Sequence, residues 1–209
     1  MNDTDFLVSG FGRFKKKFFG GTDTLYESLK SSQKPNVLVI ACSDSRVDPA
    51  ILFDADPGDL FVVRNVANIV PPHMDDGGTH GVSAALEFAT CNLEVKHIVV
   101  LGHSHCGGIQ ALLKGASGKF ISQWMKIAER AVADVHIDRR TKLSESKVRA
   151  CEQSAILLSL GNLTTFPFIQ SRIEDSKLTI HGWFFDIDNG ELLGLDPRTR
   201  EFVTLKVPM

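Results

Sequence analysis

The chain has 209 residues and is 43% hydrophobic, which is enough to bury a full core, and this length fits one domain better than two. Its 23 lysines and arginines against 25 aspartates and glutamates leave a formal charge of -2, so the chain lacks the basic excess of a nucleic-acid-binding protein. Its apolar runs are far shorter than the roughly 20 residues that cross a bilayer, so neither nucleic acid nor a membrane is an expected partner.

The N-terminal residues begin with acids and lack the basic flank and apolar stretch of a secretory signal. Four cysteines are too few for a disulfide scaffold in a chain of this size. We therefore expect a cytoplasmic protein whose cysteines are core residues, metal ligands or nucleophiles.

Apolar side chains at helical spacing over residues 5–31, interrupted by Gly20 and Gly21, predict an arm of two helices. Short continuous apolar runs, typical of strands covered on both faces, occupy residues 37–41, 61–63 and 97–101. Helical patterns occupy residues 81–92, 108–114, 119–134 and 144–161, and Pro167 begins another short helix. Two further strands, 178–185 and 191–195, flank a turn signal at residues 188–190.

Strands that alternate with helices predict an α/β fold, with a central, mostly parallel β-sheet, flanking helices and an antiparallel edge from the final hairpin. We expect a single domain over residues 1–209, with an N-terminal helical arm at 1–34 and the core at 35–209. In such sheets, ligands bind beyond the carboxyl ends of the strands. Chemically reactive residues follow two of the predicted strands directly, residues 42–46 after the first strand and residues 102–108 after the third.

The residues Cys42, His103 and Cys106 suit a zinc ion, because thiolate and imidazole are preferred zinc ligands. Three protein ligands leave one position open, as in catalytic rather than structural sites. Because neighbouring parallel strands lie about 4.8 Å apart, two strand ends can share one metal. Taken singly, each residue is also consistent with a core cysteine or a hydrogen-bonded loop histidine.

Asp44 and Arg46 follow Cys42 at two-residue spacing, which in an extended chain directs all three side chains to the same side. Away from a metal, such a pair would be an ordinary surface ion pair. Beside a metal, Asp44 either binds zinc as a fourth ligand and closes the site, or pairs with Arg46 and leaves room for water.

Three blocks of the chain resemble the signature blocks of the beta-class carbonic anhydrases, in the same order: ACSDSR at 41–46, FVVRNVAN at 61–68 and GHSHCGG at 102–108. The resemblance covers nearly the whole chain. It implies one zinc ion (Zn2+) per subunit on Cys42, His103 and Cys106, with Asp44 and Arg46 as the catalytic pair. The implied reaction is the reversible hydration of carbon dioxide to bicarbonate and a proton by zinc-bound hydroxide. The resemblance also implies an N-terminal arm swapped onto a second subunit, in a homodimer or a dimer-based larger oligomer.

The resemblance to plant-like members extends to the substrate site. Gln33 matches a glutamine that donates an amide hydrogen bond in the neighbouring subunit's pocket, and the Gly107 amide matches a substrate contact. Phe61 and Val66 match the apolar wall against which carbon dioxide rests. Phe88 stands where plant members usually have a tyrosine, so the hydrogen bond of that hydroxyl is absent here.

One bacterial subgroup of the family has a regulatory bicarbonate site made of a tryptophan, a tyrosine and an arginine. Val39 and Phe185 stand at the first two of these places, and Arg64 is retained. We therefore expect this regulatory pocket to be missing and the resting site to be open.

Two alternatives stay open. The same fold and zinc site could hydrolyse carbon disulfide or carbonyl sulfide, since a fold does not fix its substrate. The chain could instead be a non-catalytic zinc- or bicarbonate-binding regulator with four protein ligands on the metal, although Asp44, Arg46 and Gln33 speak against this reading.

Overall fold

The computed structural model describes residues 4–21, 25–115, 117–137 and 143–207, and the chain forms two compact units that divide between Lys34 and Pro35. The N-terminal unit holds α1 (Asp5–Phe19) and α2 (Leu25–Leu29). No side chain of α1 is buried. The ring of Tyr26 stacks on that of Phe19, with centroids 4.6 Å apart, and this contact joins the two short helices.

Among the residues that the structure describes, none of the helices has both the length and the apolar character that a membrane span requires.

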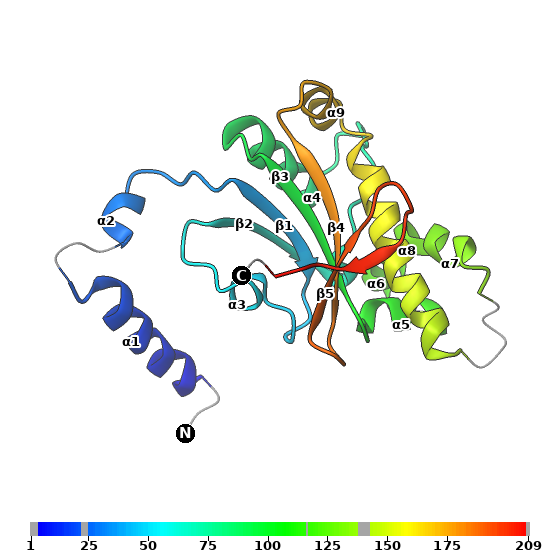
Figure 1. Ribbon diagram of the computed structural model, residues 1–209, viewed down its shortest axis with the longest axis horizontal. Helices are drawn as coiled ribbons and strands as arrows, with labels where there is room; N and C mark the ends of the chain where they lie inside the picture. The colour runs from blue at the N-terminus through cyan, green and yellow to red at the C-terminus, as the bar shows by residue number, and fades with distance from the viewer. Residues whose placement is uncertain (1–3, 22–24, 116, 138–142, 208–209) are drawn as a thin grey trace. The chain divides into compact units, whose positions relative to one another are not determined.

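The second unit is built on a six-stranded sheet with the strand order β2-β1-β3-β4-β5-β6 (Figure 1). Its strands are β1 (Val37–Cys42), β2 (Leu60–Asn65), β3 (His97–His103), β4 (Thr179–Asp186), β5 (Glu191–Leu195) and β6 (Phe202–Thr204). The first four are mutually parallel, whereas β5 and β6 are antiparallel to their neighbours. The predicted α/β fold, with a mostly parallel sheet and an antiparallel edge, is confirmed.

The helices of this unit are α3 (Pro49–Leu52), α4 (Gly81–Glu87), α5 (Gly107–Lys114), α6 (Lys119–Met125), α7 (Glu129–Asp134), α8 (Glu145–Leu163) and α9 (Pro167–Glu174). Short helical turns complete them: η1 (Val66–Asn68), η2 (Phe88–Asn92) and η3 (Lys126–Ala128). The helix predicted over 119–134 is therefore interrupted by η3, and the one predicted over 81–92 ends in the π-helical η2. The sequence did not predict α3 or β6, because elements of four and three residues are too short for a periodic pattern.

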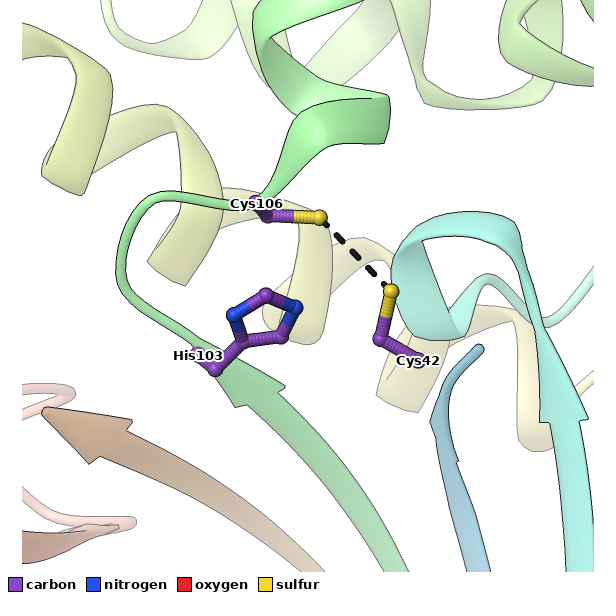
Figure 2. A group of neighbouring side chains, drawn as sticks. All are labelled: Cys42, His103 and Cys106. Atoms are coloured by element: carbon purple, nitrogen blue, oxygen red, sulfur yellow. Dashed lines mark hydrogen bonds between the residues drawn. The ribbon is translucent and has the colours of Figure 1, made fainter. Parts of the chain in front are cut away.

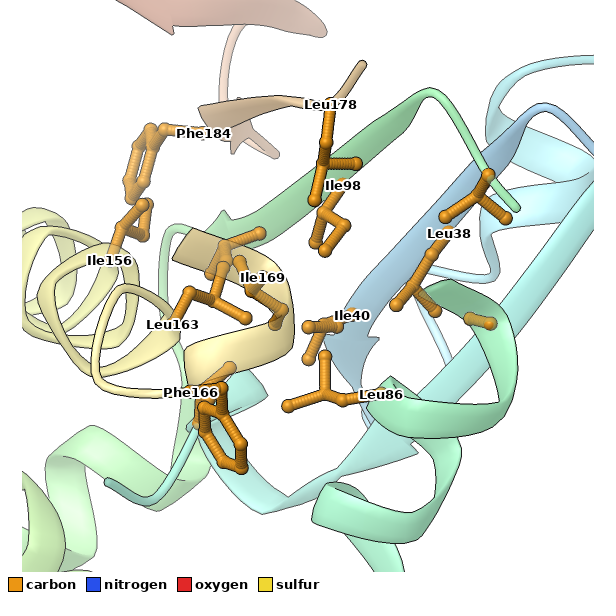
Figure 3. Close-up of a cluster of buried hydrophobic side chains, with 14 of the residues drawn as sticks. Leu38, Ile40, Leu86, Ile98, Ile156, Leu163, Phe166, Ile169, Leu178 and Phe184 are labelled. Atoms are coloured by element: carbon orange, nitrogen blue, oxygen red, sulfur yellow. The ribbon is translucent and has the colours of Figure 1, made fainter. Parts of the chain in front are cut away.

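The main core lies between one face of the sheet and the helices α4, α8 and α9 (Figure 3). Strand residues in this core include Leu38, Ile40, Ile98 and Phe184, and they meet Leu86, Ile156, Leu163, Phe166 and Ile169 from the helices and the α8–α9 turn. Side chains alternate between the faces of a strand, so Val39, Ala41, Val99 and Leu101 form a second buried cluster on the other face. Both faces of β1 and β3 are therefore apolar and buried, as is typical of central parallel strands.

Candidate metal centre

Two neighbouring strands and one helix start bring the predicted zinc ligands together. Cys42 ends β1 and His103 ends β3, and these parallel strands pair with Ala41 opposite Leu101. Cys106 is the N-cap of α5, three residues after His103. All three side chains are buried, and their ligand atoms lie within 4.8 Å of one another. In Figure 2 the two sulfur atoms, 3.9 Å apart, and the imidazole ring face a common point.

The chemistry of these donors fits a zinc ion. The Nδ1 atom of His103 lies 2.8 Å from the carbonyl oxygen of Ser104, which makes Nδ1 the protonated ring nitrogen. The Nε2 atom, with its lone pair, is buried and has no hydrogen-bond partner among the described residues. A buried polar atom without a partner is costly, and a metal ion would satisfy it. Zinc prefers four ligands, so two sulfur atoms and one imidazole nitrogen would leave one coordination position open.

The two thiols are electrostatically linked. A hydrogen bond from the Cys106 thiol, helped by the backbone of Asp44 and Ala67, lowers the pKa of Cys42 to about 4. The same bond raises the pKa of Cys106, and burial adds to this shift. The shared hydrogen bond thus moves the pKa values of the two thiols in opposite directions and favours a thiolate at Cys42.

Asp44 is held by Arg46 through a bidentate ion pair. The Nε atom of Arg46 donates to Oδ1 at 2.9 Å and its Nη2 atom to Oδ2 at 2.7 Å, while the Arg46 backbone N–H also donates to Oδ1. These contacts hold the pKa of Asp44 well below its usual range. Its Oδ2 atom lies 4.0 Å from Nε2 of His103. An ionised carboxylate thus stands beside the ligand cluster and is turned toward Arg46.

Arg64 holds together the loop that carries Cys42 and Asp44. Its Nε atom donates to the Cys42 carbonyl oxygen at 3.0 Å, its Nη2 atom to the Asp44 carbonyl oxygen at 2.6 Å, and its Nη1 atom to Asp48 at 2.8 Å.

Val39 and Phe185, the other two positions compared with the regulatory site, belong to the apolar cluster on the second face of the sheet.

Sequence reasoning missed Glu152 of α8. Its Oε1 atom accepts a hydrogen bond from the Cys106 backbone N–H at 2.9 Å, and the side chain is buried. Burial raises the pKa of Glu152 to about 7, although the Cys106 N–H favours the ionised form. The signal was available, because Glu152 lies beside Cys151 and three residues before Ala155 on a buried helix face, where an acidic side chain needs a partner.

The residues predicted to bind substrate fall into separate places. Val66 is 37% exposed and packs against the start of α5, where Gly107 is the first helical residue. Phe61 pairs with Leu38, four positions before Cys42 in the register, which is roughly 13 Å along the strand. Phe88 packs on Phe61, with ring centroids 5.9 Å apart. Gln33 is exposed in the N-terminal unit, in the segment after α2.

Comparisons with known proteins agree with one another. The family model described as carbonic anhydrase matches residues 37–192. A carbonic anhydrase of Synechocystis sp. is 39% identical over 202 residues, which cover 94% of this chain and 73% of that protein. The structure of the beta-carbonic anhydrase CcaA is similar with a TM-score of 0.87 and 35% identity, covering 99% of this chain and 94% of that one. A structure from a study of two tetrameric beta-carbonic anhydrases of Sordaria macrospora gives a TM-score of 0.80 and 29% identity, covering 93% and 98%.

Proposed function

Since the chain belongs to the beta-class carbonic anhydrase family, we propose that it hydrates carbon dioxide reversibly with a zinc ion held by Cys42, His103 and Cys106. The observation that carries the proposal is the convergence of three zinc-type donor atoms within 4.8 Å of one another. In the reaction, one water and one carbon dioxide give bicarbonate and a proton.

A zinc ion held by Cys42, His103 and Cys106 would supply Lewis acidity, which makes a water molecule easier to deprotonate. Asp44 accepts a hydrogen bond from the attacking oxygen at a carboxylate oxygen and so directs a lone pair toward the carbon of carbon dioxide. Arg46 keeps this carboxylate ionised and turned away from the ligands, because it donates two side-chain hydrogen bonds to it. Asp44 is thus the orienting group of the reaction.

The substrate rests against Val66, and the Gly107 N–H stabilises the negative charge that develops on oxygen. This N–H is available because the first amides of a helix have no partner within the helix. Gln33 donates its side-chain amide to the same oxygen from a second subunit. Phe61 pairs with Leu38, four positions before Cys42 on β1 and so roughly 13 Å away along the sheet, and Phe88 packs on it; we therefore propose that both contribute to the apolar wall of a second copy's site.

The assembly that we propose is a homodimer or a larger oligomer built from dimers, with the N-terminal arm swapped onto the partner. The exposed apolar side chains of α1 support it, as do the tetrameric relatives from Sordaria macrospora. The cytoplasmic location stays a prediction from the sequence.

The proposal is tested by zinc analysis and stopped-flow carbon dioxide hydration on the wild type, Cys42→Ser and Cys91→Ser. Cys91 is exposed and provides the same chemical change away from the ligands. We expect one zinc per chain and rapid hydration for the wild type and Cys91→Ser. Cys42→Ser should lose most of its zinc and at least about a hundredfold in rate, because a hydroxyl is a poor zinc ligand.

Zinc-loaded wild type that does not hydrate carbon dioxide, or a Cys42→Ser variant that keeps both metal and rate, would contradict the proposal. Carbon disulfide and carbonyl sulfide are assayed on the same samples. Faster turnover of either gas than of carbon dioxide would favour the alternative substrate class.

A further inference from the structure

We propose that Trp124 is a positioning residue for the metal centre, acting through the turn Val66–Asn68 that follows β2. The indole Nε1 of Trp124, on α6, donates a hydrogen bond to the Val66 carbonyl oxygen at 2.8 Å. The two residues are 58 positions apart, so only the tertiary structure brings them together. This inference rests on the proposed function, because it concerns the same zinc and substrate site.

The turn needs support because its backbone is strained. Ala67 has φ 64° and ψ 26°, and Asn68 has φ 47°, so two successive residues with side chains adopt the left-handed region. This region is unfavourable for alanine, although asparagine tolerates it better, and a strained alanine persists there only where the surroundings hold it. The side chain of Asn65 bridges the turn, since Oδ1 accepts from the Ile69 N–H at 2.8 Å and Nδ2 donates to the Ile69 carbonyl oxygen at 2.9 Å. Trp124 adds a further hydrogen bond to the turn, at the Val66 carbonyl oxygen.

The turn lies against both thiolate ligands. Asn65, the residue before the turn, pairs with Cys42 in the β1–β2 register, and its carbonyl oxygen accepts a hydrogen bond from the Ser43 N–H at 2.9 Å. Ala67 is buried in the same cluster as Cys42 and Cys106. On its other side the turn packs on Gly108, the second residue of the helix that Cys106 caps. A Cβ at Gly108 would lie 2.8 Å from Cγ1 of Val66 and 2.9 Å from Cβ of Ala67. A shift of the turn would therefore reach Cys42 directly and Cys106 through the start of α5.

The turn also carries a substrate-facing group. Val66 is the partly exposed wall residue of the proposed site, and its own carbonyl oxygen is the acceptor for Trp124. Trp124 itself is half-buried and packs beside the cluster that contains Cys42, Cys106 and Met125. The Trp124 indole thus links helix α6 to Val66, the residue of the substrate wall, and to the turn beside Cys42.

The test compares Trp124→Phe with Trp183→Phe. Phenylalanine keeps an aromatic ring at position 124 but removes the N–H donor. Trp183, the second tryptophan, packs edge-on against Phe53 on the other face of the sheet and provides the matched control. Zinc affinity is measured by chelator competition, the ligand geometry by the visible absorption of the Co2+-loaded protein, and kcat and KM by carbon dioxide hydration.

We expect Trp124→Phe to bind zinc about two- to tenfold more weakly, to shift the Co2+ absorption bands and to raise KM for carbon dioxide by a similar factor, as the loss of one hydrogen bond predicts. Trp183→Phe should leave all three readouts near the wild type. Wild-type values for Trp124→Phe, or equal changes in both variants, would overturn the inference. If the wild type did not hydrate carbon dioxide, the proposed function would fail, whereas zinc affinity and Co2+ absorption would still test the role of Trp124.

Discussion

Asp44 offers the sharpest prediction for a single residue. Asp44→Asn keeps the shape of the side chain but replaces one acceptor oxygen with an NH2 donor. Because Arg46 holds the pKa of Asp44 well below its usual range, the wild-type carboxylate is ionised at every pH from 6 to 9. We expect Asp44→Asn to lower kcat/KM about 10²- to 10³-fold across this whole range, with unchanged zinc content. Stopped-flow hydration at several pH values measures the effect.

The pH dependence has a definite sign. The pKa of the Asp44 carboxyl group is lower in the folded protein than in the unfolded chain, where it is about 3.9. The ionised carboxylate therefore stabilises the fold at pH values above about 3.9, and this stabilisation is lost as the pH falls through the lower pKa of the folded state. Asp44 therefore contributes no pH dependence to stability between pH 6 and 9.

Asp175→Asn, at an exposed residue that pairs with Lys177, is the matched control for Asp44→Asn and should keep wild-type kinetics. Substantial activity in Asp44→Asn at any of these pH values would argue against an orienting carboxylate.

At the level of elements, the close approach of α5 to η1 fixes the position of Cys106. Gly108 has no room for a methyl group, because the Val66 and Ala67 side chains would lie under 3.0 Å from it. We expect Gly108→Ala to lower the free energy of unfolding by about 1–3 kcal/mol, as in other overpacked sites. Zinc affinity should fall as well, since the start of α5 must move. Urea denaturation and chelator competition measure the two effects.

Gly161→Ala provides the control for this substitution. Gly161 lies in α8, and nothing surrounds the position that its Cβ would occupy within 4 Å. Alanine there should be neutral or stabilising by up to about 1 kcal/mol, because it favours the helix. Equal stability of Gly108→Ala and the wild type would show that the start of α5 tolerates a methyl group.

At the scale of the whole molecule, the exposed side chains of α1 support the proposed oligomer. Its side chains Phe6 and Phe11 are 63% and 61% exposed, and no residue of this helix is buried. An apolar surface of this kind marks an interaction site. We expect the double variant Phe6→Asp with Phe11→Asp to have a lower molar mass than the wild type in size-exclusion chromatography with light scattering.

The control for this prediction adds the same charge to α1 without removing an apolar side chain. Ser9→Asp with Gly12→Asp changes two exposed positions and should keep the wild-type molar mass. If both double variants assembled like the wild type, the apolar side chains of α1 would not be needed for oligomerisation.

Local information explains why so much of the fold could be predicted from the sequence. Strands β1 and β3 are continuous apolar runs, α8 follows a helical pattern capped by Ser144, and β5 follows a turn signal. Each of these signals lies within a few consecutive residues. The broken helix between α6 and α7 and the short elements α3 and β6 were not predicted, because tertiary packing rather than periodicity defines them.

The sequence by itself determined the chemistry of the candidate site, because Cys42, His103 and Cys106 stand where predicted strands end and because zinc prefers these residue types. Only the tertiary structure decided which groups support that site. Glu152 meets the Cys106 amide, and Trp124 meets the Val66 carbonyl oxygen, across 46 and 58 positions of the chain. Such contacts depend on how the helices pack against the sheet, and no local pattern of residues records that packing.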